Sequence, residues 1–188
     1  MANIIYKAEL TKAMKLLADD DKSIFIGQGT LYGGISMYPT MRDVPKNKII
    51  EVPVFEDTQC GMSLGMALEG YTVISIFPRM DFLICATNQI VNHLDKIGEM
   101  SEGQFNPKVI IRTAIGSSRP LMPGPQHCQD YTEAFKSMCK YINVVKLERA
   151  EYIVPAYEAA LKSNKPSMLI EVPESYLSRG PDNGKIKS

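Results

Sequence analysis

Three residues with charged or titratable side chains stand where the sequence suggests a binding site. His127 lies in a segment bounded by glycine and proline, where it either exchanges a proton near neutral pH or is an exposed loop residue without a task. Glu56 begins a segment of helical character, where a carboxylate also suits the helix N-terminus. Arg79 follows a short apolar run, and its guanidinium either binds an anionic group or stays in solvent.

Cysteine and histidine are the candidate metal ligands. Cys128, Cys139, His93 and His127 could together hold zinc, but their spacing fits no common zinc-binding pattern. The four cysteines form no CxxC pair, so we interpret them as buried thiols. We expect no metal to be held by this chain alone, and we assign His93, inside a helical segment, no role.

The elements that must position these residues alternate along the chain. Apolar runs predict strands at residues 23–26, 49–54, 72–77, 109–113, 144–147 and 168–172. Helical spacing predicts helices at residues 8–17, 57–68, 82–97, about 130–141 and 151–161. This alternation predicts an α/β fold with a mostly parallel central sheet and helices on both faces. Since such sheets bind ligands at the carboxyl ends of their strands, the candidate loops follow Ile26, Val54, Phe77 and Thr113.

Length and charge narrow the class of protein. The 188 residues, 45% of them hydrophobic, suit one domain at 1–177 followed by a polar tail at 178–188. Lysine plus arginine number 21, as do aspartate plus glutamate, so no excess charge favours nucleic acid or an anionic membrane. The first residues lack the order of a signal peptide, and no apolar run approaches the roughly 20 residues that span a bilayer. We therefore expect a cytoplasmic protein whose partners are proteins or small molecules.

The common catalytic signatures are missing from the sequence. It contains no GxGxxG, GxxxxGK[ST], GxSxG or HExxH. The usual dinucleotide, P-loop, hydrolase and zincin interpretations are therefore unsupported.

A series of motifs nevertheless resembles one known family. The segment VPVFEDTQCGMSLGMALEG at 52–70 is followed by MDF at 80–82 and NQIVNH at 88–93. A glycine-rich GQGTLYGG at 27–34, PKVIIR at 107–112 and GPQHCQ at 124–129 complete the pattern. In this order, from about residue 7 to 171, the motifs are similar to the beta subunit of 2-oxoacid dehydrogenases of the pyruvate and branched-chain type. The resemblance implies the transketolase-like, pyrimidine-binding fold of enzymes that use thiamine diphosphate.

The resemblance implies roles for four residues. Glu56 matches the glutamate that hydrogen-bonds N1′ of the aminopyrimidine ring and so helps its exocyclic nitrogen to take the C2 proton of the thiazolium. Phe82 matches an aromatic residue that packs on the pyrimidine, and the neighbouring Met80 is assigned to the same cofactor site. His127 matches a histidine on the substrate side. The alternatives are a helix cap for Glu56, a core position for Phe82 and an idle loop histidine.

The same resemblance implies a partner. In this superfamily a Gly-Asp-Gly motif with a downstream asparagine holds Mg²⁺ and the diphosphate, and this sequence has no such motif. We therefore expect an alpha-like subunit that carries the diphosphate domain, an α2β2 assembly, and an exposed apolar patch on this chain for the partner.

Two departures from the family keep the activity open. Beta subunits of the family continue into a C-terminal domain that the sequence does not contain, and the residues that flank Glu56 differ from the usual ones. We expect a beta-like subunit of a split enzyme acting on a 2-oxo acid or ketose. The alternatives are a decarboxylase, carboligase or transketolase-like subunit not linked to a lipoyl complex, and a non-catalytic regulatory module.

Overall fold

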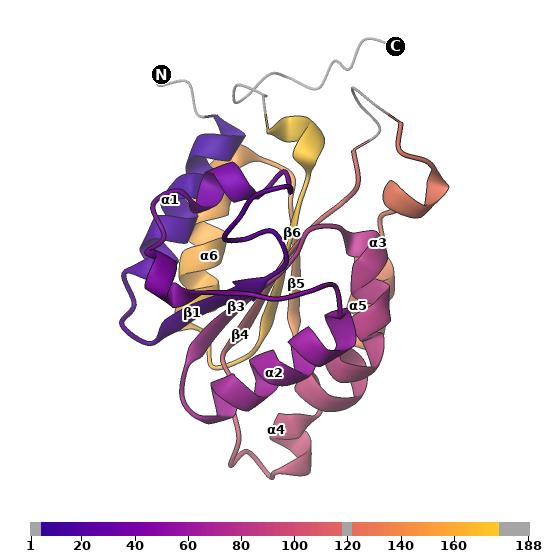
Figure 1. Ribbon diagram of the computed structural model, residues 1–188. Helices are drawn as coiled ribbons and strands as arrows, with labels where there is room; N and C mark the ends of the chain where they lie inside the picture. The colour runs from indigo at the N-terminus through magenta and orange to yellow at the C-terminus, as the bar shows by residue number, and fades with distance from the viewer. Residues whose placement is uncertain (1–4, 118–121, 177–188) are drawn as a thin grey trace.

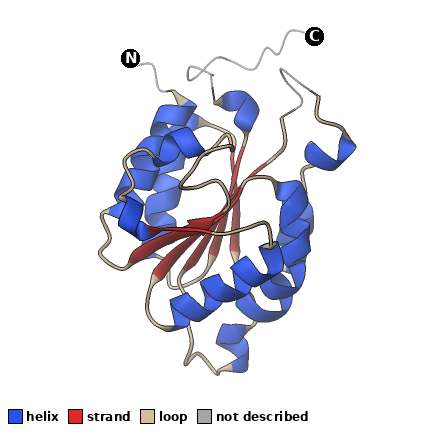
Figure 2. Ribbon diagram, viewed as in Figure 1, coloured by secondary structure: helices blue, strands red, loops and turns tan. Residues whose placement is uncertain are grey.

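The computed structural model describes residues 5–117 and 122–176, and these residues contain one sheet of six parallel strands. The strands stand in the order β2-β1-β3-β4-β6-β5. Figure 2 shows them as a single layer with helices on either side. The α/β prediction is confirmed. Strand bounds are Ser23–Gly27 (β1), Ile49–Glu51 (β2), Thr72–Phe77 (β3), Val109–Ala114 (β4), Asn143–Leu147 (β5) and Ser167–Glu171 (β6).

Helices cover both faces of the sheet (Figure 1). One face carries α1 (Tyr6–Ala18) and α6 (Ile153–Lys162); the other carries α2 (Glu56–Leu68), α3 (Met80–Leu83) and α5 (Thr132–Met138). A short helix, α4 (Ile97–Met100), lies beyond α3. Successive residues of the central strands face opposite layers: Ile110 packs beneath α1 and α6, and Ile111 packs beneath the other helices. Two apolar cores result, and every residue of β3 and β4 is buried between the two layers of helices.

Two predicted elements differ from those observed. The strand predicted at residues 49–54 ends at Glu51, because Pro53 has no N–H to continue the ladder and the chain turns into α2. The helix predicted at residues 82–97 is helical over most of that length but changes hydrogen-bond register repeatedly. It passes from α3 into a 3-10 turn, Ile84–Ala86, and then into a π-helical turn, Gln89–Leu94.

A buried carboxylate fixes the end of this irregular helix. Asp95 accepts backbone N–H groups from Lys140 (3.1 Å), Tyr141 (2.7 Å) and Ile142 (3.0 Å), just before β5. Its carboxylate also pairs with the Lys96 ammonium at 2.6 Å. Burial alone would raise the pKa of Asp95, but the bonds from Lys96 and the three amides outweigh it and hold the pKa below its usual value. Asp95 therefore ties the α3–α4 segment to the edge of the sheet.

Replacing Asp95 with asparagine is expected to lower the free energy of unfolding at pH 7 by about 2 to 3 kcal/mol, since buried amide donors lose a charged acceptor. Because the folded-state pKa of Asp95 is depressed, its contribution is present above the unfolded pKa and is lost as pH falls through the folded pKa. Urea unfolding at pH 7 and at successively lower pH measures this contribution. The difference in the free energy of unfolding between the parent and D95N should become smaller as the pH falls. The exposed Asp43→Asn is the control, with a change within about 0.5 kcal/mol at each pH. A constant difference across that range would contradict this account.

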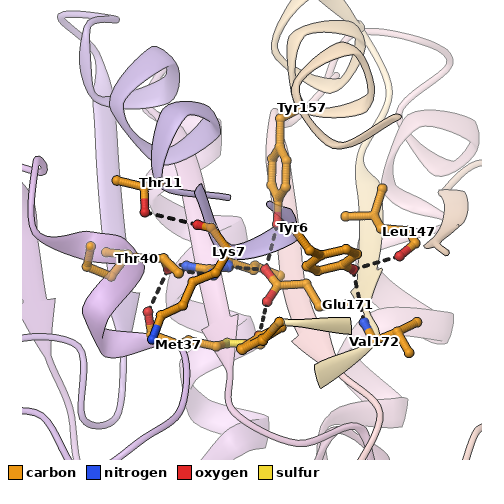
Figure 3. Close-up of polar contacts among 12 residues, drawn as sticks. Tyr6, Lys7, Thr11, Met37, Thr40, Leu147, Tyr157, Glu171 and Val172 are labelled. Carbon is orange, nitrogen blue, oxygen red and sulfur yellow. Dashed lines mark hydrogen bonds and ion pairs between the residues drawn. The ribbon is translucent and has the colours of Figure 1, made fainter. Parts of the chain in front are cut away.

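A second polar cluster lies inside the face covered by α1 and α6 (Figure 3). Arg112 of β4 and Glu171 of β6 are both fully buried, and their Nε and Oε1 atoms are 2.5 Å apart. Glu171 also accepts the hydroxyls of Tyr157, at 3.2 Å, and of Tyr176. Arg112 donates through Nη2 to Thr40 at 2.8 Å. The Glu171 carboxylate keeps the pKa of Arg112 above its ordinary value despite burial, so the guanidinium stays charged.

Tyr6 connects this cluster to the ends of two strands. Its hydroxyl donates to the Leu147 carbonyl at 2.6 Å and accepts the Val172 N–H at 3.0 Å, and its ring stacks on Tyr176 with centroids 5.7 Å apart. The first helix is thereby joined to the carboxyl edge of β5 and β6 (Figure 3). The polar tail expected at residues 178–188 lies outside the described residues. No helix among the described residues is both long and apolar enough to cross a bilayer.

Candidate functional site

Glu56 is positioned by a polar anchor under the first turn of α2. Gln59, one turn further on, is buried and donates through Nε2 to the carbonyl of Ile76 at 3.0 Å and to the Ser75 hydroxyl at 3.1 Å. Ser63 bonds the same Ser75 hydroxyl at 2.9 Å. Gln59 and Ser63 of α2 are thus hydrogen-bonded to the carboxyl half of β3. These bonds hold the N-terminus of α2 at the edge of the sheet where ligands bind.

The Glu56 carboxylate itself is uncommitted. It is half-buried at the first position of α2 and makes no hydrogen bond or ion pair with any other described residue. The helix has no side-chain cap, so Glu56 does not satisfy an orphan N–H. A carboxylate without a partner is free to accept a hydrogen bond. A protonated ring nitrogen of a ligand would need such an acceptor.

The turn from β3 to α3 supplies the aromatic residue of the site. Phe82 is 38% exposed at the end of α3 and its ring lies edge-on to the imidazole of His127, with centroids 5.3 Å apart and planes at 80°. Part of the Phe82 side chain is therefore open to contact with a bound group. Met80 is completely buried, and its sulfur accepts the Tyr131 N–H at 3.3 Å. Its assignment to the cofactor stays a prediction, because in this chain it contacts the core and the following loop.

His127 lies in a short 3-10 turn, Pro125–His127, after β4. The Arg79 guanidinium donates through Nη1 to the His127 carbonyl at 3.1 Å. Gly116, just beyond β4, faces the same carbonyl so closely that a Cβ there would overlap it. The loop is therefore pressed against the end of β4. The interpretation of Arg79 as an anion-binding residue is untested, and its observed partner is a neutral carbonyl.

Asp81 lies beneath this loop. It is 9% exposed, its Oδ1 accepts the Gln129 N–H at 3.1 Å, and its Oδ2 is buried with no hydrogen-bond partner among the described residues. Sequence reasoning did not single out Asp81. Its only signal was its place beside Met80 and Phe82, in the turn after a buried strand.

The glycine-rich loop after β1 lies at the same edge of the sheet. Glu51, the last residue of β2, accepts the N–H groups of Gly29 and Leu31 and the Thr30 hydroxyl. Gly29 has φ +67°, in the left-handed region that glycine adopts without strain. Loops from β1, β2, β3 and β4 therefore converge at one edge, as the parallel sheet predicts.

Residues 3–177 match a family described as "Transketolase, pyrimidine binding domain". The chain belongs to this family. Among curated relatives of this pyrimidine-binding domain are pyruvate dehydrogenase E1 component beta subunits. That of Gracilaria tenuistipitata var. liui is 27% identical over 177 residues, 91% of this chain and 53% of the relative. That of Cyanidium caldarium is 26% identical over 172 residues, 89% of this chain and 51% of the relative.

The pyrimidine-binding domain also resembles a solved structure. A split gene transketolase, described as an inactive beta4 tetramer, superimposes with a TM-score of 0.66 at 13% identity, over 90% of this chain and 51% of that one. This likeness supports the fold. The chain spans about half the length of these relatives, and less than a third of a rice chloroplastic beta subunit that it matches at 30% identity over 124 residues.

The structure brings some of the predicted site residues together and leaves others apart. Phe82 and His127 are in ring contact, whereas Glu56 makes no hydrogen bond or ion pair with His127 in the described part of the pyrimidine-binding domain. Within the described residues, no three side chains of histidine, cysteine, aspartate or glutamate are grouped to hold a metal, so the zinc alternative has no site there. Cys60 and Cys139 are buried, whereas Cys85 is exposed, which corrects the expectation that every cysteine is buried.

Proposed function

We propose that this chain is the beta-like, pyrimidine-binding subunit of a split thiamine-diphosphate-dependent enzyme that acts on a 2-oxo acid or a ketose. The carrying observation is the Glu56 carboxylate, free of partners at the start of α2, while Phe82 and His127 meet on the neighbouring α3 side. Membership of the pyrimidine-binding family and similarity to pyruvate dehydrogenase beta subunits support the same proposal.

The residues present fit the aminopyrimidine end of the cofactor. When bound, thiamine diphosphate supplies a carbanion centre that accepts the acyl or two-carbon unit. Glu56 would hold a proton at N1′ of the aminopyrimidine, and Phe82 would pack on the ring. His127 would exchange a proton with the substrate. The Phe82 ring contacts the imidazole edge-on.

A partner subunit would complete the site. Two hollows on the described surface, of about 480 and 270 Å³, are lined by neither Glu56 nor Phe82. Apolar side chains near them are exposed, on and just before α2 and on the α3 segment packed against it: Val54, Met62, Phe82 and Ile84. Burying these side chains against a second protein would be favourable. The partner would be an alpha-like subunit that holds Mg²⁺ and the diphosphate, in an α2β2 assembly.

The acceptor of the transferred unit separates the enzyme alternatives. Similarity to pyruvate dehydrogenase beta subunits favours decarboxylation of a 2-oxo acid with acyl transfer. A transketolase-like two-carbon transfer is the second candidate, because the split transketolase shares the fold. Release of an aldehyde would instead indicate a decarboxylase. Location in the cytoplasm stays a prediction from the sequence.

Calorimetry with thiamine diphosphate and Mg²⁺ tests the assembly. The chain alone is expected to bind the cofactor weakly, because it offers one side of the site, and a complex with a diphosphate-domain subunit is expected to bind tightly. The partner subunit alone is the control for binding that needs no contribution from this chain. Tight, Mg²⁺-dependent binding by this chain alone would contradict the proposal that the partner subunit holds Mg²⁺ and the diphosphate. A complex that binds no cofactor would favour the non-catalytic module.

A further inference from the structure

The loop that carries His127 has little backbone structure of its own. Between residues 122 and 130, the one hydrogen bond that joins two backbone groups of the described loop runs from the His127 N–H to the Gly124 carbonyl, at 3.1 Å. A loop with so few internal bonds takes its position from whatever packs against it. The side chains that contact it therefore determine where the imidazole lies.

Three consecutive side chains make those contacts. Arg79 donates to the His127 carbonyl at 3.1 Å, Met80 accepts the Tyr131 N–H at 3.3 Å, and Asp81 accepts the Gln129 N–H at 3.1 Å. They bind alternate residues of the loop, at 127, 129 and 131. All three belong to the turn that leads directly to Phe82. The loop and the aromatic ring are thus held by one short, rigidly packed segment.

Gly116 makes a further close approach to the loop. Because a Cβ at this position would overlap the His127 carbonyl, the backbone of the loop lies directly against the end of β4. The His127 carbonyl is therefore approached closely by Gly116 and also accepts the Arg79 guanidinium. A carbonyl restrained by these two contacts leaves the attached histidine less freedom to move away from Phe82.

We propose that Arg79 and Asp81, backed by Gly116, are positioning residues that set the imidazole of His127 against Phe82 and toward the substrate. This inference rests on the proposed function, in which His127 serves the substrate. Arg79 is the decisive member, since its single bond to this loop is to the residue that carries the imidazole. Among described arginines, Arg42, Arg112 and Arg149 each pair with a carboxylate, whereas Arg79 has no ion pair and is committed to this carbonyl.

Histidine NMR tests the inference on the chain alone. The sequence has two histidines, so ¹³C labelling of histidine gives two ring signals, assigned with His127→Ala and His93→Asn. The edge-on Phe82 ring gives the His127 signal a ring-current shift. Arg79→Met is expected to abolish that shift and to leave the exposed His93 unchanged, and Arg79→Lys, which keeps one donor, should restore part of it. Arg42→Met, the same change at an exposed site remote from the loop, should move neither signal.

Gly116→Ala provides a second route to the same displacement. The added methyl must push the His127 carbonyl away, so the His127 signal should move as it does in R79M. Amide spectra confirm that each variant is folded. An unshifted His127 signal in a folded R79M or G116A protein would overturn the proposal.

The reconstituted complex provides the functional measurement. Arg79→Met should lower turnover on the order of 10- to 100-fold through misplacement of the imidazole, with cofactor affinity unchanged and activity partly rescued in R79K. Normal turnover in R79M would overturn the inference. If His127 moves as expected but the complex binds no thiamine diphosphate, the proposed function fails while the positioning role stands. If His127 stays in place, the positioning role fails whatever the complex binds.

Discussion

Glu56→Gln is expected to leave the chain folded and able to join its partner, while exchange of the C2 proton of bound thiamine diphosphate slows by roughly 10² to 10⁴-fold. Glutamine keeps the size of the side chain but removes the charge that, in the proposed mechanism, holds a proton at N1′. Loss of one charge-assisted hydrogen bond should weaken cofactor binding by about 1.5 to 3 kcal/mol. The effect on exchange is larger because the rate depends on the protonation state that the carboxylate stabilises.

Asp57→Asn is the matched control for this variant. Asp57 follows Glu56 in the first turn of α2, so its replacement removes the same charge from the same helix terminus. If Glu56 only interacts with the positive end of the helix dipole, both variants should lose about 0.3 to 1 kcal/mol of stability. Both should then exchange the C2 proton at the parent rate. Deuterium exchange measured in the holo-complex decides between the two accounts, and parent-like exchange in E56Q would refute the proposed mechanism.

Arg112→Met is expected to destabilise the chain by about 3 to 5 kcal/mol, because it leaves the Glu171 carboxylate buried without its cation. A loss of that size is a large part of the stability of an ordinary domain. Urea unfolding of R112M against the parent measures it. The exposed pair of Arg149 and Glu151 offers the control, and Arg149→Met should cost about 1 kcal/mol or less.

The double variant R112M/E171Q separates loss of the ion pair from loss of packing. With both charges removed, no unpaired charge is buried, so the double variant should be less destabilised than the sum of the two single variants. If the losses of stability in the two single variants simply add in the double variant, the two side chains act independently. That result would contradict a stabilising bond between Arg112 and Glu171.

The sequence predicted the sheet well because its strands are locally distinctive. The run at residues 72–77 is buried on both faces and matches β3 residue for residue. The segment predicted as a helix at 82–97 is helical over most of its length, with Leu83 and Ile90 in the core, but its hydrogen-bond register was not predicted. Asp95, near the end of that segment, bonds to backbone amides 45 to 47 positions away, and spacing within the segment carries no information about such contacts.

The site was predictable only in part, for a similar reason. Glu56, Phe82 and His127 could be picked out through resemblance, and the contact between Phe82 and His127 agrees with a shared site. The partner of Arg79 could not be predicted, because it is a backbone carbonyl and any residue type provides one. Arg112 gave a clearer signal, since an arginine inside a buried strand requires an internal anion. Its partner, however, depends on β6 lying beside β4, ahead of β5, which the order of the strands in the sequence does not show.

The bonds of Tyr6 have a consequence for the synthesis of this protein. Its hydroxyl is held by groups 141 and 166 residues further along the chain, and α1 packs on α6. During translation α1 can pack early on β1 and on the 3-10 turn Tyr38–Met41, but the part of its face that packs on α6 stays uncovered until nearly the whole domain has left the ribosome. Contacts this distant in sequence also slow folding, because the intervening chain must be ordered before they form. The nascent chain therefore exposes apolar surface of α1 for most of its synthesis, and transiently exposed surface of this kind favours aggregation.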